Sequence, residues 1–131
     1  MEMFIENTSR YNFADTVERL TEAVTGASWK VSHVHDLRET MKKNNLEVLP
    51  VMVLEVCKPS LSYKILSKDD ERVYSALMPC RISVYEKEDG NVYLSRMNAG
   101  SFASSLKPSA SEVMTAAFFE MEKILEQIIK L

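Results

Sequence analysis

Hydrophobic residues recur along this chain with two different periods, and these periods mark its predicted helices and strands. Apolar residues at 13, 17, 20 and 24 follow helical spacing, which predicts a helix that Asn12 caps with Asp15 as the acidic partner. We expect Gly26 to end this helix in a left-handed conformation. The segments 3–8 and 29–35 indicate strands, and 49–56, apolar on both faces, is typical of a central or covered strand.

Two further helices and a bend are predicted between these strands and the second half of the chain. Asp36 and Glu39 form a capping box for a short helix to about residue 43, whose Leu37 and Met41 should face inward. Pro59 suits the first turn of a helix carrying apolar residues at 61, 65 and 66. The charged stretch 68–72 should be a solvated bend before a further turn.

A β-hairpin is predicted around Gly90. A three-residue loop at 88–90 sets Val84 opposite Leu94 and Tyr85 opposite Tyr93, which keeps the apolar and polar faces apart. Glycine suits the last loop position, which needs a left-handed backbone.

The end of the chain predicts a surface loop at 98–108 and then a long helix. Ser109 and Glu112 resemble a capping box, and the helix should run to about Lys130. Its apolar stripe is wider than a helix resting one edge on a sheet requires. This order of elements predicts one α+β domain over 1–131 with a mostly antiparallel sheet.

Composition restricts the function classes. Hydrophobic residues make up 46% of the 131 and the net charge is −3, which suits a folded core and argues against nucleic-acid binding. No run approaches the ~20 apolar residues of a membrane span, and no signal peptide is visible. Two cysteines are too few for a disulfide scaffold, so we expect a cytoplasmic domain. Serine nucleophile elbows, phosphate loops and dinucleotide fingerprints are absent from the sequence.

Two cysteines are candidates for chemistry. Cys57 precedes Lys58 at a helix start, where the helix end and the lysine would both favour a reactive thiolate. Cys80 enters the hairpin on the face of Ile82. Both thiols are otherwise ordinary small apolar residues. Strand alternation starts them on opposite sides of the sheet, which weakens a disulfide or shared-metal model.

Two histidines offer a weaker, metal-binding alternative. His33 and His35 lie two apart on a strand and can point the same way, but further ligands at a recognisable spacing are missing. His35 also precedes Asp36, where it would simply hydrogen-bond the helix start.

Contact-type residues share the sheet face opposite the expected core. If helices cover one side only, the other is lined by Tyr85, Tyr93, Arg81, Met97 and Glu55. These types are enriched at contact surfaces, although ordinary cross-strand pairing on a solvated face explains them equally well.

The segments 53–59 and 78–86, with the Pro79-Cys80-Arg81 block most distinctive, resemble domain-of-unknown-function family 302 over about residues 3–98. Asn12-Phe13, His35-Asp36 and the segment 95–98 match as well. The resemblance implies a curved antiparallel sheet of the TATA-binding-protein-like type, β-α-β(4)-α, with helices on one face. It also implies homodimers, consistent with the wide stripe of the last helix, and marks residues without assigning them roles: His35, Cys57, Cys80, Arg81, Tyr85 and Met97.

Three hypotheses of function follow. The first is a homodimeric binding domain that holds a small ligand or a soft metal at the open sheet face or dimer cleft, since thiolates and thioethers favour soft metals. Its candidate residues are Cys57, Cys80, Arg81, Glu55, Tyr85 and Tyr93 for a ligand, and His35, His33, Cys57, Cys80 and Met97 for a metal. The second is a thiol-dependent redox enzyme or sensor using Cys57. The third is a protein–protein assembly module. The sequence names no cofactor.

Overall fold

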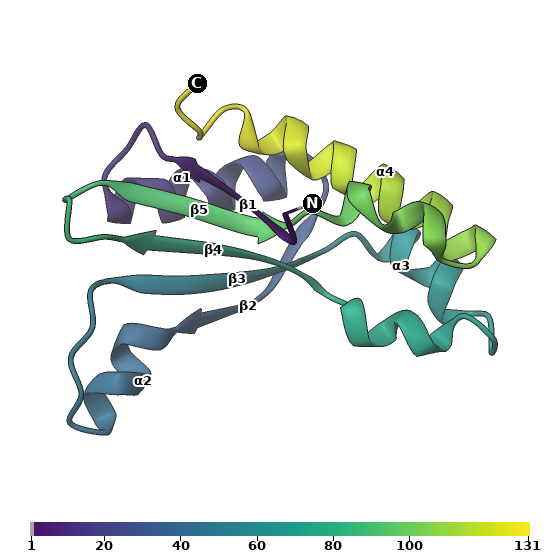
Figure 1. The fold of residues 1–131 in the computed structure, drawn as a ribbon, viewed down its shortest axis with the longest axis horizontal. Helices are drawn as coiled ribbons and strands as arrows, with labels where there is room; N and C mark the ends of the chain where they lie inside the picture. The colour runs from purple at the N-terminus through teal and green to yellow at the C-terminus, as the bar shows by residue number, and fades with distance from the viewer. Residues whose placement is uncertain (1) are drawn as a thin grey trace.

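The computed structural model describes residues 2–131 and contains one antiparallel sheet in the order β1-β5-β4-β3-β2 (Figure 1). The strands are β1 (Phe4–Thr8), β2 (Lys30–Asp36), β3 (Val51–Cys57), β4 (Cys80–Glu86) and β5 (Val92–Met97). Strands β4 and β5 form the predicted hairpin, in which Val84 pairs with Leu94 and Tyr85 with Tyr93. Gly90 takes a φ of 81°, so the three-residue loop is confirmed. The predicted α+β class is also confirmed.

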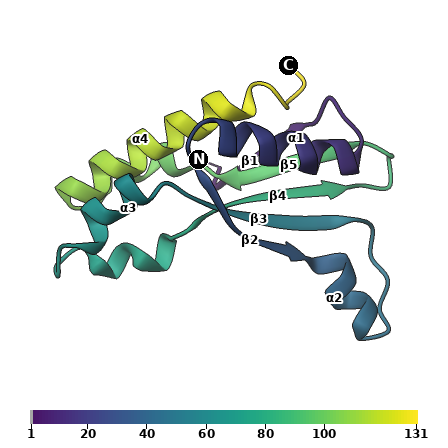
Figure 2. The same cartoon turned by 180° about the vertical axis from the view of Figure 1, so that it is seen from behind.

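Helices α1 (Phe13–Gly26) and α4 (Pro108–Leu125) pack on one face of this sheet. In Figure 2 α1 lies in front of the strands, whereas in Figure 1 no helix lies in front of the middle of the sheet. The core beneath the helices is formed by fully buried aliphatic side chains, and full burial of each stabilises the fold by about 1.5–3 kcal/mol. The largest of them are Leu20, Leu54, Ile82, Leu94, Leu125 and Ile128.

The wide apolar stripe of α4 is covered by the chain itself. One part of the stripe, including Met121 and Ile124, joins the main core between the helices and the sheet. Another part packs against α3 (Pro59–Leu66) and forms a second core of Ile65, Ala103, Ala110, Val113 and Met114. The stripe therefore gives no support for a partner subunit, and the homodimer stays a prediction that depends on the family resemblance.

Two local predictions near the N-terminal half hold only in part. Asn12 caps α1 by accepting from the Asp15 backbone N–H at 2.8 Å, as predicted. Gly26, however, is the last helical residue, and the left-handed position falls on Ser28, with φ 66°. Helix α2 (Leu37–Lys43) begins at the predicted cap Asp36 but buries none of its residues, so Leu37 and Met41 do not enter a core. It lies past the end of β2 and below the start of β3, away from α1 and α4, which explains this (Figure 1).

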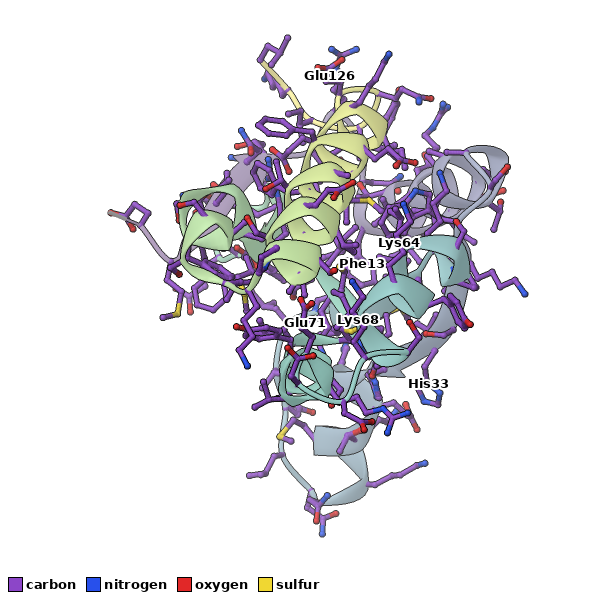
Figure 3. All side chains as sticks on the ribbon, turned by 90° about the vertical axis from the view of Figure 1, so that its right-hand side faces the viewer. Phe13, His33, Lys64, Lys68, Glu71 and Glu126 are labelled. Carbon is purple, nitrogen blue, oxygen red and sulfur yellow. The ribbon has the colours of Figure 1, made fainter. Side chains whose placement is uncertain are left out.

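The start of α4 is capped by a residue far away in the sequence. Ser109 and Glu112 form no capping box; the N-cap is Lys107, which gives no side-chain hydrogen bond. Instead the buried carboxylate of Glu71 accepts the Ala110 backbone N–H at 2.6 Å. Figure 3 shows Glu71 beside the first turn of α4. The stretch 68–72 is therefore not fully solvated, because Glu71 occupies the positive end of a helix whose own N-cap lacks an acceptor.

The end of the chain differs from the prediction in two places. Helix α4 stops at Leu125, about 27 Å from its start, and Ser9 and Ile129 then form an isolated bridge beside β1. Residues 98–107 contain two short 3-10 turns, η2 (Ala99–Ser101) and η3 (Ala103–Ser105), and Ala103 is fully buried against α4. This segment is thus a packed connection rather than a surface loop. No helix in residues 2–131 has the length and apolar character to span a membrane.

Candidate functional site

The open face of the sheet carries most of the residues that the sequence singled out. The strand register places Tyr85 beside Tyr93 and Glu55 beside Arg81 on this face. None of the helices described in residues 2–131 seals it, and Arg81 and Met97 are exposed. The division into a covered and an open face is therefore confirmed.

The hairpin end of the open face holds two tyrosines in a polar network. The rings of Tyr85 and Tyr93 lie nearly parallel with centroids 6.1 Å apart, and Lys87 lies over the Tyr93 ring. Burial, and then the hydrogen bond that Tyr85 donates to Glu6, raise the pKa of Tyr85 to about 12. Tyr93 donates to Asp89 at 2.5 Å, which raises the Tyr93 pKa. Both hydroxyls are thus committed to carboxylates of the same chain.

The β2 edge of the open face holds a histidine–carboxylate pair. A β-bulge between Val31 and His33 shifts the register, so the two histidines lie on the open face although Val31 faces the core. Their rings are 4.4 Å apart, and His35 Nε2 donates to Glu55 Oε1. This hydrogen bond, with smaller contributions from the charges of Arg81 and the histidines, lowers the Glu55 pKa against the opposing effect of desolvation. Figure 3 shows His33 at the periphery of the molecule.

A cavity opens where β4 and β5 separate. Pairing of β4 with β5 ends at Ile82 and Arg96, whereas β4 continues along β3 to Cys80 and β5 continues along β1 to Met97. The segment that precedes β4 contains η1 (Arg72–Leu77), and the segment that follows β5 enters η2. The two segments diverge beside α4 (Figure 1). A wedge-shaped gap is therefore left between the start of β4 and the end of β5.

This wedge, the splayed-strand cavity, has a volume of about 350 Å³. Its walls come from the two strand ends, η1, the segment 97–102 and α4, and they are mostly apolar. The lining residues that are exposed, and so mark its mouth, are Phe4, Ala76, Arg81 and Met97. The half-buried and buried ones include Val53, Leu77, Cys80, Ile82, Phe102, Met114, Ala117, Phe118 and Met121. Small-molecule sites are concave and mostly apolar with a few placed polar groups, which describes this cavity.

The charged groups of the cavity are arranged in two ways. Arg96 is buried, and its guanidinium bonds the Glu122 carboxylate at 2.6 and 2.8 Å and the Asn7 side-chain oxygen at 2.6 Å. Each nitrogen of this guanidinium donates one hydrogen bond, and the bidentate ion pair fixes α4 against β5. Arg81 lines the mouth, is exposed, and has no ion-pair partner within 4 Å among residues 2–131.

The two cysteines line a second, smaller cavity instead of opposite sides of the sheet. Cys57 and Cys80 share it with Trp29 and Met78, and both are free thiols. Burial, and then the neighbouring Cys57, raise the pKa of the Cys80 thiol. Lys58, the cation expected to favour a Cys57 thiolate, pairs with Glu120 at 2.5 Å. The shared cavity corrects the sequence expectation: the alternation of β3 ends at Cys57, where the chain turns into α3. The redox role of Cys57 stays a prediction.

The predicted metal ligands do not come together. His33 and His35 lie on β2 and Met97 on β5, with two strands between them at ~4.8 Å spacing, and the cysteines lie at the opposite end of β3 from the α2 turn. Within the described residues, no group of three His, Cys, Asp or Glu side chains is arranged to hold a metal ion. The soft-metal set is therefore not assembled by the fold.

The sequence missed most of the walls of the splayed-strand cavity. It identified Arg81, Cys80 and Met97 but not Ala76, Leu77, Phe102 or Phe118. One signal was present: Phe102 is a large aromatic residue inside an otherwise small and polar segment, which is typical of a packed rather than a solvated loop.

Comparison with known proteins then decides the family. The model of the family described as "Domain of unknown function DUF302" matches residues 5–128. The chain belongs to the DUF302 family. This DUF302 domain is 31% identical over 122 residues to an uncharacterised protein of Aquifex aeolicus (strain VF5), covering 90% of this chain and 75% of that protein. The resemblance noted from the Pro79-Cys80-Arg81 block is confirmed.

A solved structure shares the fold of this DUF302 domain. The crystal structure of an uncharacterised conserved DUF302 protein from Bacillus stearothermophilus superposes with a TM-score of 0.84 at 18% identity, covering 97% of this chain and 98% of the other. At that identity the likeness establishes the fold alone. Both relatives are described as uncharacterised, so the function has to be argued from the site.

Proposed function

We propose that this DUF302 domain binds a small, mostly apolar molecule in the splayed-strand cavity. The observation that supports this most strongly is a hollow of about 350 Å³ with mostly apolar walls beside the open face. This is the volume of about a dozen waters, or a ligand of about ten non-hydrogen atoms. Burying apolar surface stabilises the complex by ~25 cal/mol per Å², and the preformed walls reduce the ordering cost.

A larger hollow on the same chain supports this less well. It measures about 580 Å³ and lies between the start of α1, the hairpin loop and the C-terminal residues. Charged and polar side chains line it, including Arg10, Asn12, Asn91 and Lys130, and it is a shallow surface depression. A ligand there would bury little apolar surface, so we assign binding to the smaller cavity.

The test uses a neutral probe and a blocked cavity. Octan-1-ol has about the right number of atoms, and isothermal titration calorimetry should show one site per chain with a negative heat-capacity change. Ala76 is exposed at the mouth, so Ala76→Phe adds bulk there without opening the core. Ser75 is exposed on the same short helix but does not line the cavity, which makes Ser75→Phe the matched control.

We expect Ala76→Phe to abolish octan-1-ol binding and Ser75→Phe to retain it. Equal binding by both variants would place the probe elsewhere on the molecule, and failure of the wild-type chain to bind any apolar probe of this size would refute the proposal. Urea unfolding of both variants checks that the substitutions leave the fold intact.

A further inference from the structure

We propose that the ligand of the splayed-strand cavity is an amphipathic anion, with its apolar body in the cavity and a carboxylate bound by Arg81 at the mouth. This inference rests on the proposed function, because it assigns a chemical class to the same site. It goes beyond that function because an apolar cavity by itself does not select a charge.

The position of Arg81 is the first argument. The residue lies on the open face at the start of β4, paired in register with Glu55, and its side chain lines the cavity. Arg81 precedes Ile82, the first β4 residue that pairs with β5, so its guanidinium lies at the edge of the wedge. A group held there would sit in water while the rest of the molecule enters the apolar interior.

The second argument is the pattern of charge around the mouth. Glu55, the nearest acidic residue in register, accepts a hydrogen bond from His35, and its lowered pKa keeps it ionised at neutral pH. Glu55 and Arg81 approach closely enough to interact but do not form an ion pair within 4 Å. The buried Arg96 already has its charge paired with Glu122, and each of its three nitrogens donates one hydrogen bond, to Glu122 or Asn7. Arg81 is therefore the lining cation whose donors are available to a ligand.

The third argument is the chemistry of the guanidinium. Its planar fork of N–H donors matches a carboxylate with two parallel hydrogen bonds, which are stronger than neutral ones. The mouth offers few competing acceptors: apart from Glu55, its neighbours on the open face are Val53, Ser83, Ser95, Met97 and Phe4. A neutral hydroxyl can accept one of these hydrogen bonds but gains neither the charge attraction nor the second parallel bond, and a cationic headgroup has no acceptor and is repelled.

The experiment compares three probes of the same length: octanoate, octan-1-ol and octylamine. We expect wild-type protein to bind octanoate about tenfold more tightly than the alcohol, as a charge-assisted hydrogen bond predicts, and octylamine more weakly than either. Arg81→Met should remove the preference for octanoate and leave octan-1-ol binding within about twofold. Arg81→Lys should keep part of the preference, because a point charge remains without the fork.

Controls separate this inference from the proposed function. Arg38 is exposed on α2, away from the cavity, so Arg38→Met should change nothing. Equal affinities for octanoate and octan-1-ol, or a preference that survives Arg81→Met, would overturn the anion assignment while the cavity proposal stands. Loss of every probe in wild-type protein would overturn both. We expect no co-sedimentation of the protein with phosphatidylglycerol vesicles. Co-sedimentation that depends on Arg81 would overturn the assignment of a free acid and identify the ligand as a membrane lipid.

Discussion

The long-range cap of α4 leads to a quantitative prediction. Glu71 is 4% exposed, and its carboxylate accepts the backbone N–H of Ala110, itself fully buried, at 2.6 Å. Glu71→Ala leaves that N–H buried without an acceptor and removes a negative charge from the positive end of the helix. Because Lys107 supplies no side-chain cap, no other residue of the first turn replaces the lost acceptor.

The expected loss follows from these contacts. A lost helix cap costs about 0.5–2 kcal/mol, and a buried unsatisfied N–H costs about 1–3 kcal/mol. Since both figures describe the same bond, we expect Glu71→Ala to lower the free energy of unfolding by about 2–3 kcal/mol. Glu71→Gln keeps an oxygen acceptor and loses only the charge–dipole attraction, so it should cost about 1 kcal/mol.

Urea denaturation followed by circular dichroism measures this directly. With an m-value of about 1.5 kcal/mol/M, Glu71→Ala should lower the midpoint by about 1.5 M without changing m. Asp70→Ala is the matched control: the adjacent side chain is exposed, and it should change stability by less than about 0.5 kcal/mol. A Glu71→Ala midpoint equal to that of the control would refute the assignment of Glu71 as the cap.

The same substitution reaches the proposed site. Glu71 directly precedes η1, and its bond ties η1 to the first turn of α4, so the bond joins two walls of the splayed-strand cavity. Glu71→Ala should therefore also weaken octan-1-ol binding, measured by calorimetry under conditions in which the variant remains folded. Unchanged binding would show that the cavity walls are held by other contacts.

Three further predictions follow from single contacts. Burial, and then the hydrogen bond to Glu6, raise the pKa of Tyr85 to about 12 from an unfolded value of 10.0, so the neutral phenol favours the folded state below pH 10, and this contribution is lost as the pH rises through 12. Tyr85→Phe should cost less than about 1 kcal/mol at neutral pH, given the exposure of the pair, and should remove one late step from the absorbance titration of the tyrosines. A Cβ at Gly100 would lie 2.9 Å from the Phe118 ring, so Gly100→Ala should displace that ring, lower stability by about 1 kcal/mol and weaken octan-1-ol binding; unchanged calorimetry would contradict the described cavity wall. Asn12→Ala removes the α1 cap and should cost about 1 kcal/mol in urea unfolding, and a neutral result would show that the cap is dispensable.

Local chemistry made part of this fold predictable. Asn12 and Asp36 cap their helices as predicted because a side-chain oxygen and a backbone N–H three residues on interact over a short distance. The hairpin loop and its register follow from the position of Gly90 and from strict alternation. The same alternation predicted the open face with Arg81 and Tyr85, since a strand has only two faces.

Other features depend on residues that are distant in the sequence. Glu71 caps a helix that begins 37 residues later, at Pro108, and nothing in either segment marks the pairing. The bulge before His33 and the early separation of β4 from β5 are decided by how neighbouring strands twist and pack. Alternation predicts which face a side chain occupies only while strand pairing continues.

The sequence by itself thus determined the elements, their order, the hairpin register and the two faces of the sheet, because these depend on interactions within a few residues. Only the tertiary structure decided that the strand ends splay into a cavity and that the two cysteines share one hollow. It also decided that Arg81 lies at the mouth of that cavity with no ion-pair partner in the described part of the chain. Each of these depends on where separate segments meet, and the free energy of those contacts is not encoded in any local pattern.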